Sequence, residues 1–231
     1  MTRKHLLPGV VLITSSLALA SCALVSRGET LQVRYFTLEQ RGAATQTPAA
    51  AKSELELRLG RVDASGGLGE QLAVRTGQNE LTYREDQRWT ERPAQFVRRG
   101  LERALFEERG LTRAYSGAVP TLDVELVELE MDQSSTPTAR VRLVARLHDE
   151  RRGLCQDSFA SSEPVVRGEG SEPVAASVAS LSNALQRSLD QLATRVVQCL
   201  SSREQAASAQ PAPASAQPSD AADSARASRG E

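Results

Sequence analysis

The feature that most constrains how this chain can fold is a regular apolar repeat near its C-terminal end. Between Glu172 and Leu200, apolar side chains recur three or four residues apart over about seven helical turns. The repeat consists of Val174, Val178, Leu181, Leu185, Leu189, Leu192, Val196 and Cys199. This spacing predicts one long amphipathic helix with Ser171 as a candidate N-cap. We expect its apolar stripe to cover one face of a sheet; a seam between copies of a homo-oligomer is the alternative.

A sheet for that helix to cover is predicted by segments that are rich in β-formers or that alternate apolar and polar residues. The predicted strands are residues 32–38, 54–62, 71–75, 80–84, 121–131, 140–147 and 154–159. Hairpin turns are expected at residues 76–79 and 132–137, which are rich in turn-forming residues. The alternation changes phase at Leu126 and Val127, which predicts a β-bulge.

A second helix is predicted between the two groups of strands. Thr90 is a candidate N-cap, Pro93 falls in the first turn and Gly110 ends the helix. Its apolar stripe is Val97, Leu101, Ala104 and Leu105. Trp89, the only tryptophan, should lock the start of this helix against the core; an anchor in an interface is the alternative. The elements together predict one α+β domain over residues 32–200, with two main helices packed on a largely antiparallel sheet.

The N-terminal residues have the pattern of an export signal. A basic start, Met1–His5, precedes an apolar run, Leu6–Ala20, that is too short to span a bilayer as a helix. Residues 1–21 are therefore interpreted as a signal peptide and left out of the fold. The cleavage site, Leu-Ala-Ser-Cys at residues 19–22, resembles the lipobox of bacterial lipoproteins.

The lipobox resemblance implies a covalent lipid anchor. In that class the cysteine thiol, here that of Cys22, receives a diacylglycerol, and the new amino terminus takes an N-acyl chain such as palmitate. Several acyl chains hold a protein on a membrane far more firmly than one chain does. In lipoproteins of the common Gram-negative sorting type, Asp directly after the lipidated cysteine retains the protein in the inner membrane. This position is Ala23 here, which implies sorting to the periplasmic face of the outer membrane. Residues 22–31 would form the lipidated tether; an ordinary signal peptide with a chance cysteine is the alternative.

The C-terminal residues 201–231 are predicted to be a disordered tail. Ala, Ser, Pro, Gln and Asp dominate this segment, which cannot bury enough apolar surface to offset its ordering entropy. A tether toward peptidoglycan or a partner is the functional alternative.

The charge balance argues against a nucleic-acid partner. The chain has 28 Lys plus Arg against 29 Asp plus Glu, a formal net charge of −1, and its Arg and Glu residues are interleaved. Nucleic-acid phosphates are bound by net basic surfaces, which this composition does not favour.

Two cysteines, Cys155 and Cys199, remain once Cys22 is lipidated. An even pair in an oxidising compartment is consistent with a disulfide, and two isolated buried thiols are the alternative. Two cysteines this far apart, with one histidine nearby in sequence, match no common ligand spacing, so no metal site is expected.

No catalytic constellation is found in the sequence. Since His5 leaves with the signal peptide, a histidine-dependent mechanism would need His148, which precedes a charged turn. The nucleophile-elbow, zinc-protease and phosphate-loop motifs are absent. Glu125, Glu128 and Glu130 fall on strand positions where a solvent-facing role explains them. We therefore expect no catalytic residue and no cofactor beyond the lipid at Cys22.

Several short segments occur in an order that resembles the auxiliary lipoproteins of ABC-type transport systems. They are Arg34–Leu38, Leu72–Arg75, a Gly-Gln-Asn turn before Leu81–Tyr83, and Arg88–Pro93 opening a helix, followed by a strand hairpin and a terminal helix. The likeness spans roughly residues 32–200. The family that it points to includes the paraquat-inducible lipoprotein of intermembrane lipid transport. This chain departs from the family in lacking aromatic residues near Val127 and Arg146 of the hairpin, and in its longer linker at residues 43–52.

The resemblance implies a non-enzymatic accessory component of an intermembrane lipid transport system. Its partners would be an MCE-domain protein, outer-membrane lipid and, indirectly, an ABC permease and ATPase. A lipoprotein that assists lipopolysaccharide or barrel-protein assembly and a periplasmic hydrolase are the rival interpretations.

Overall fold

The computed structural model describes residues 31–39, 53–166, 170 and 172–208. The predicted signal peptide, Cys22 and the predicted tether up to residue 30, Ser171 and the segment beyond residue 208 lie outside these residues. The described elements are β1 (Arg34–Phe36), β2 (Glu56–Ala64), β3 (Gln71–Gly77), β4 (Glu80–Trp89), α2 (Pro93–Glu102), the π-helix η2 (Arg103–Glu107), β5 (Thr112–Arg113), β6 (Thr121–Asp132), β7 (Thr138–His148), β8 (Gly153–Pro164) and α3 (Pro173–Ser208).

β6 is the central strand of the sheet because it has three partners. β7 runs antiparallel along one edge of β6, and β8 pairs antiparallel with the far side of β7. On the other edge of β6, β2 pairs in parallel with the first half and β3 with the last residues. β4 forms a hairpin with β3, while the short strands β1 and β5 add in parallel to β4 and β2. The sheet is mixed, and its longest ladders are antiparallel.

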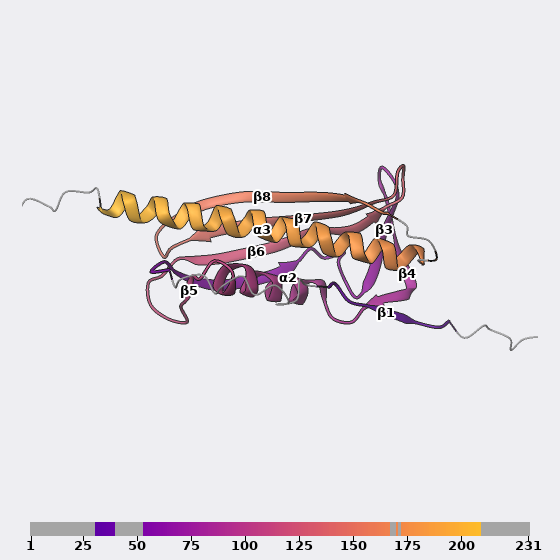
Figure 1. Ribbon diagram of the computed structural model, residues 1–231, viewed down its shortest axis with the longest axis horizontal. Coiled ribbons are helices and arrows are strands. Elements are labelled where there is room, and N and C mark those ends of the chain that lie inside the picture. The colour runs from indigo at the N-terminus through magenta and orange to yellow at the C-terminus, as the bar shows by residue number, and fades with distance from the viewer. Residues whose placement is uncertain (1–30, 40–52, 167–169, 171, 209–231) are drawn as a thin grey trace, which may run out of the picture.

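Both main helices lie on the same face of this sheet, with α3 running along the length of β7 and β8 and α2 beside it over β2 (Figure 1). The strand residues that point toward the helices are buried and apolar, because side chains alternate between the two faces of a strand. They include Leu122, Val124 and Leu126 of β6, and Val141, Leu143 and Leu147 of β7. The predicted α+β class with two helices on a sheet is therefore confirmed.

The predicted hairpins and the predicted bulge are also confirmed. β3 and β4 are joined by a tight turn at Gln78 and Asn79, and β6 and β7 by the loop at residues 133–137. The register of β6 against β7 shifts between Leu126 and Glu128, which is where the alternation of the sequence changes phase.

The first helix starts later than predicted. Thr90 is not its N-cap, because the Thr90 N–H donates to the Phe36 carbonyl at 2.9 Å as β4 pairs with β1. The helix begins at Pro93, and its N-cap residue, Arg92, makes no side-chain hydrogen bond that caps the helix. β1 lies far from β4 in sequence, and its pairing with β4 keeps the chain extended up to Thr90, where the local sequence favours a helix N-cap.

The helix ends three residues before the predicted terminal glycine, because α2 passes into the π-helix η2, whose last residue is Glu107. Gly110 adopts a positive φ of 67°, which a residue with a side chain rarely takes. The N–H of Leu111 donates to the carbonyl of Leu105 at 3.1 Å, which closes the chain after the π-helix η2.

The terminal helix is longer than predicted. α3 has 36 residues and continues past Leu200 to Ser208. Leu200 is still buried, and the Arg203 guanidinium lies 3.9 Å from the Asp149 carboxylate in the β7–β8 loop. Contacts with the sheet thus extend beyond the apolar repeat that the sequence shows.

Candidate functional site

The two ends of the described chain lie at opposite ends of an elongated molecule (Figure 1). The segment from Leu31 leads into β1 at one end, and α3 finishes at Ser208 at the other. Cys22 lies outside the described residues, so its lipidation stays a prediction. Among the described residues, no helix has the length and apolar character that a membrane span requires.

Trp89 is buried at the junction of β1, β4 and α2. It is 3% exposed, and its ring meets that of Phe96 edge-to-face, with centroids 5.9 Å apart. In the β1–β4 ladder Trp89 is the register partner of Phe36. This is the place expected of a residue that locks the start of α2 against the core.

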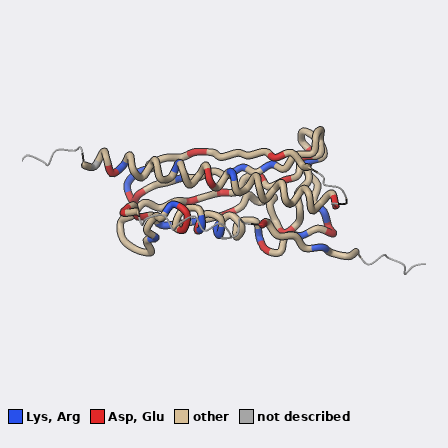
Figure 2. Tube along the Cα trace, in the orientation of Figure 1, with Lys and Arg blue, Asp and Glu red and all other residues tan. Residues whose placement is uncertain are grey.

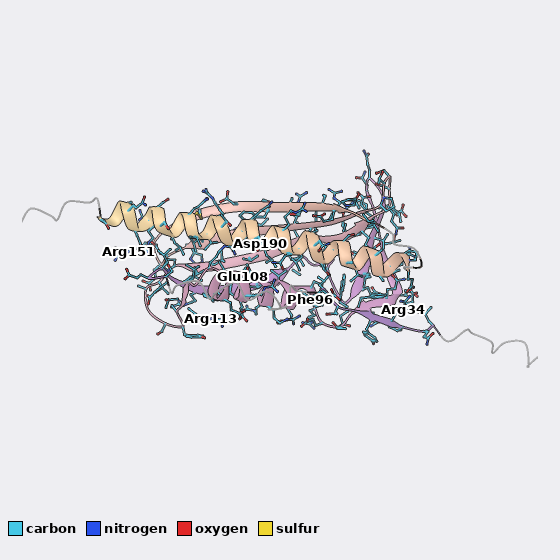
Figure 3. The ribbon with its side chains drawn as sticks, viewed as in Figure 1. Arg34, Phe96, Glu108, Arg113, Arg151 and Asp190 are labelled. Atoms are coloured by element: carbon cyan, nitrogen blue, oxygen red, sulfur yellow. A yellow bond between two sulfur atoms is a disulfide. The ribbon has the colours of Figure 1, made fainter. Side chains whose placement is uncertain are left out.

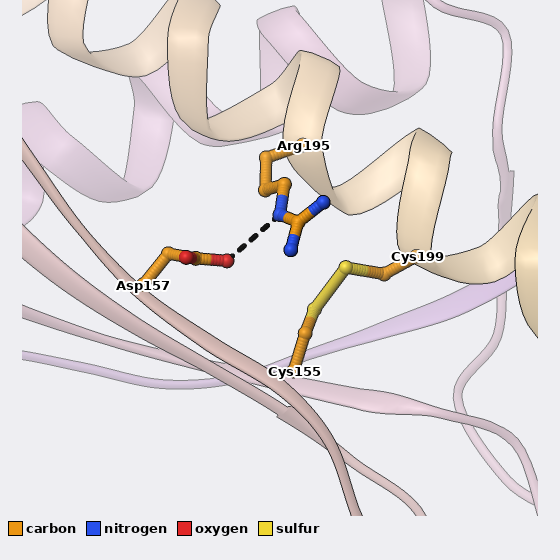
Figure 4. Close-up of a disulfide and its surroundings, with 4 residues drawn as sticks. All are labelled: Cys155, Asp157, Arg195 and Cys199. Atoms are coloured by element: carbon orange, nitrogen blue, oxygen red, sulfur yellow. Dashed lines mark hydrogen bonds and ion pairs between the residues drawn. A yellow bond between two sulfur atoms is a disulfide. The ribbon is translucent and has the colours of Figure 1, made fainter.

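Cys155 and Cys199 are brought together as a disulfide, with Cα atoms 6.5 Å apart (Figure 4). Cys155 lies near the start of β8 and Cys199 in the last third of α3. Because β8 and α3 are also joined directly along the chain at the other end of the molecule, the cross-link closes this strand–helix pair at both ends.

Asp157 lies beside the two cysteines, and the three side chains together have metal-ligand chemistry. The Asp157 carboxylate instead accepts a hydrogen bond from the Arg195 Nε at 2.8 Å, and each sulfur is bonded to the other (Figure 4). In this arrangement the cluster is a cross-link with an adjacent ion pair between strand and helix.

The face of the sheet opposite the helices carries charged side chains of both signs. Figure 2 shows that acidic and basic residues are interspersed along the whole described chain. Glu130 corrects the expectation of a solvent-facing carboxylate, because it is only 3% exposed. The Arg75 guanidinium binds it bidentately, with N–O distances of 2.6 and 2.9 Å. Glu128 is half-buried and lies 2.7 Å from Arg142, whereas Glu125 is exposed as predicted.

His148 has a carboxylate partner that sequence reasoning missed. Its Nε2 lies 3.2 Å from the Oδ2 of Asp123. In the β6–β7 ladder His148 pairs with Thr121, and Asp123 lies two residues farther along β6. The Oδ1 of Asp123 accepts the backbone N–H of Arg61 at 2.7 Å, where the β2–β6 register is irregular. Asp123 thereby holds the irregular part of β2 in place, and His148 contacts a carboxylate already engaged in the fold.

An open hollow of about 720 Å³ adjoins this carboxylate on the outer face of the sheet. Charged groups of both signs line it, namely Arg61, Asp63, Asp123, Glu125 and Arg146. Such a surface is suited to polar contact with a partner. The hydroxyl of Ser65, which also lines the hollow, donates to the Oε1 of Glu125 at 3.0 Å.

The comparisons with known proteins agree with this fold. A family model described as an ABC-type transport auxiliary lipoprotein component matches residues 36–197. The crystal structure of protein XCC0632 from Xanthomonas campestris superposes with a TM-score of 0.60 at 19% identity, over 75% of this chain and 99% of that one. A second crystal structure, of an uncharacterized protein, gives a TM-score of 0.53 at 12% identity, over 71% and 99% of the two chains. No curated protein matches.

At such low identities the two crystal structures bear on the fold alone, and the family is shown by the sequence match. That match runs from Phe36, the last residue of β1, to Val197 in α3, and so includes strands β2 to β8, α2 and most of α3. This chain therefore belongs to the family of ABC-type transport auxiliary lipoprotein components.

Proposed function

We propose that this lipoprotein is an outer-membrane-anchored, periplasmic and non-enzymatic accessory component of an MCE-type intermembrane lipid transport system. The observation that carries the proposal is the family match over residues 36–197, which follows closely after the lipobox that ends at Cys22. The family's description as an auxiliary component supports a role in positioning other proteins rather than in catalysis.

In this proposal the acyl chains at Cys22 supply the attachment and the α+β domain supplies the contact. The domain would hold an MCE-domain partner, a lipid-conducting protein, against the outer membrane, while an ABC permease and ATPase act elsewhere. A rigid, cross-linked sheet with a charged outer face suits a docking role, because polar surfaces of mixed charge give specificity to protein contacts.

The attachment is tested by labelling cells with a palmitate analogue and fractionating their membranes. We expect label on the mature chain and recovery with the outer membrane, and neither for Cys22→Ala. A mature chain that takes up no label would refute the anchor.

The partner is tested by crosslinking in intact cells, followed by purification of the lipoprotein. We expect an MCE-domain protein among the products, and deletion of the gene should sensitise cells to detergent. Recovery of a barrel-assembly or lipopolysaccharide-assembly protein instead would favour the assembly alternative. Hydrolytic activity of the purified protein that His148→Ala abolishes would favour the enzyme alternative.

A further inference from the structure

Three exposed apolar side chains lie close together in sequence at the start of the described chain. Among the described residues, the large hydrophobic side chains that are exposed are Leu31, Val33, Tyr35, Tyr83, Tyr115 and Val166. Three of them fall at alternate positions of the segment that leads into and forms β1: Leu31 is 60% exposed, Val33 36% and Tyr35 65%. Alternate residues of an extended segment point to the same side, so we treat these three as one stripe, the β1 stripe.

Side chains on the other side of β1 contact the rest of the domain. Phe36 packs against the core, and the guanidinium of Arg34 forms a bidentate ion pair with the carboxylate of Glu172, just before α3. This pair fixes β1 beside the start of α3, and Figure 3 shows Arg34 at that end of the molecule. The orientation of the β1 stripe is therefore set by contacts behind it. Its own apolar atoms face outward.

The same end is the one that a lipid anchor would hold near a bilayer. Nine residue steps separate Cys22 from Leu31. A fully extended chain covers about 3.3–3.6 Å per residue, so Leu31, the first residue of the β1 stripe, cannot lie farther than roughly 30 Å from the anchored residue. The opposite end of the molecule is farther away by up to the length of α3, about 54 Å for 36 residues.

We propose that Leu31, Val33 and Tyr35 rest on the phospholipid surface that carries the anchor, as a second, weaker contact beside the acyl chains. The inference rests on the lipidation of Cys22 in the proposed function. Tyrosine suits the membrane–water interface because its ring is apolar and its hydroxyl is polar. Aliphatic side chains beside it gain from leaving water.

The size of the β1 stripe favours a lipid surface over a protein partner. Stable protein interfaces bury about 1,200–2,000 Å² in total, far more than three side chains on one edge strand can supply. A tethered contact needs much less area, because the anchor keeps the local concentration of the membrane high. Weak apolar contacts are then enough to hold this end against the bilayer.

The test places an environment-sensitive fluorophore on the full-length, lipidated protein in phospholipid vesicles. Tyr35→Cys carries the label in the β1 stripe, and Tyr115→Cys, 82% exposed in the unmodified chain, is the matched control. The chain's own cysteines do not compete, since Cys22 is acylated and Cys155 and Cys199 are bonded to each other. We expect a blue shift and quenching by spin-labelled lipid at position 35, and neither at position 115.

Two further variants examine the neighbours of the label. Leu31→Ser with Val33→Ser should reduce the blue shift at position 35, whereas Gln32→Ser, in the same segment, should leave it unchanged. All three positions are exposed, so the fold should be unaffected.

The outcomes separate this inference from the proposed function. If vesicles float with the protein but the label at position 35 behaves as in water, the docking contact is refuted and the anchor stands. Protection of that label from aqueous quencher without quenching by spin-labelled lipid would identify a second copy of the chain instead, and also refutes it. If the protein does not float, the anchor fails and the docking contact falls with it.

Discussion

Gly100 of α2 lies directly against Leu189 of α3, and its lack of a side chain makes that approach possible. A Cβ added there would lie 2.3 Å from the Cδ1 of Leu189, which is 1% exposed and has little room to move. Helix propensity alone favours alanine over glycine by about 1 kcal/mol. Overpacking a buried contact costs about 1–3 kcal/mol, so the steric cost should win.

We therefore predict that Gly100→Ala lowers the free energy of unfolding by about 1–2 kcal/mol, measured by urea denaturation. Gly69→Ala is the matched control, because a Cβ at Gly69 meets nothing within 4 Å. In a double-mutant cycle, Gly100→Ala should cost less when Leu189 is already Ala. An unchanged or raised stability for Gly100→Ala would show that the helices can move apart freely.

The Arg75–Glu130 pair is the most deeply buried ion pair on the outer face of the sheet. The two side chains are 24% and 4% exposed, and the carboxylate has both oxygens occupied by the guanidinium. Removing one charge leaves the other partly desolvated, which costs far more than losing an exposed pair. Glu130→Gln should lower the free energy of unfolding by about 2–4 kcal/mol.

The comparison for Glu130→Gln is Asp63→Asn, which removes the exposed pair with Arg61 at 3.6 Å. That change should cost less than about 0.5 kcal/mol. Equal losses of unfolding free energy in the two variants, measured in the same urea titration, would show that burial of Glu130 does not make loss of its charge more costly.

At the scale of elements, two aspartates organise the turns at either end of β7. Hydrogen bonds from the hydroxyl and backbone N–H of Ser134 lower the pKa of Asp132, with Arg140 contributing further. The backbone N–H groups of Arg151 and Arg152 lower the pKa of Asp149. Both carboxylates therefore stabilise the turns in their charged form.

The direction of the pH dependence follows from these lowered pKa values. Their stabilisation is fully present above the unfolded-state pKa of 3.8 and is lost as pH falls through the folded-state values. We predict that stability falls less steeply below about pH 4 in the double variant Asp132→Asn with Asp149→Asn than in the unmodified chain. Parallel acid titrations of the two proteins, followed by circular dichroism, would show this; identical curves would exclude the effect.

The Cys155–Cys199 cross-link belongs to the β8–α3 unit. Its sequence separation of 44 residues corresponds, in the chain-entropy model, to about 4 kcal/mol of stabilisation from the restricted unfolded state. The double variant Cys155→Ser with Cys199→Ser should lose about 2–4 kcal/mol in urea denaturation. Thiol titration of the unmodified chain in denaturant without reductant should find neither cysteine reactive, and reactive thiols there would mean that the pair is not bonded.

The sequence predicted correctly those elements that are specified by the spacing of apolar residues within their own segment. The β6–β7 hairpin, its bulge at Leu126 and the helix α3 all follow from alternation or from a helical repeat. Non-local pairing decided the rest. β4 extends to Trp89 because β1 lies beside it, and β6 pairs in parallel with β2 and β3 across long stretches of chain.

The candidate site divides in the same way. The even number of cysteines left after lipidation of Cys22 suggested a disulfide between Cys155 and Cys199. The position of Trp89 directly before a predicted helix suggested that its side chain is buried. The partner of Glu130 could not be read from sequence, because Arg75 lies on a strand 55 residues away. The exposure of Tyr35 was also missed, since a segment rich in β-formers gives no indication of which side faces water.

At the scale of the whole molecule, one continuous core joins both halves of the sheet. Buried side chains from β2, β3, β6 and β7 and from both helices form a single cluster, which also includes Trp89. A domain with one core should unfold as a unit, even though β1, β3 and β4 pair with the rest of the sheet through the last residues of β6.

The single tryptophan makes this cooperativity measurable. Trp89 reports on the junction of β1, β4 and α2, whereas far-ultraviolet circular dichroism reports largely on the 36 residues of α3. We predict that the two probes give the same urea midpoint with the disulfide intact, because neither region can lose its packing without exposing the shared core. A fluorescence transition at clearly lower urea would mean that the β1–β4 end opens on its own while α3 stays folded on β7 and β8. That end would then be a separately adjustable part of the molecule, placed where the chain leads back to its proposed anchor.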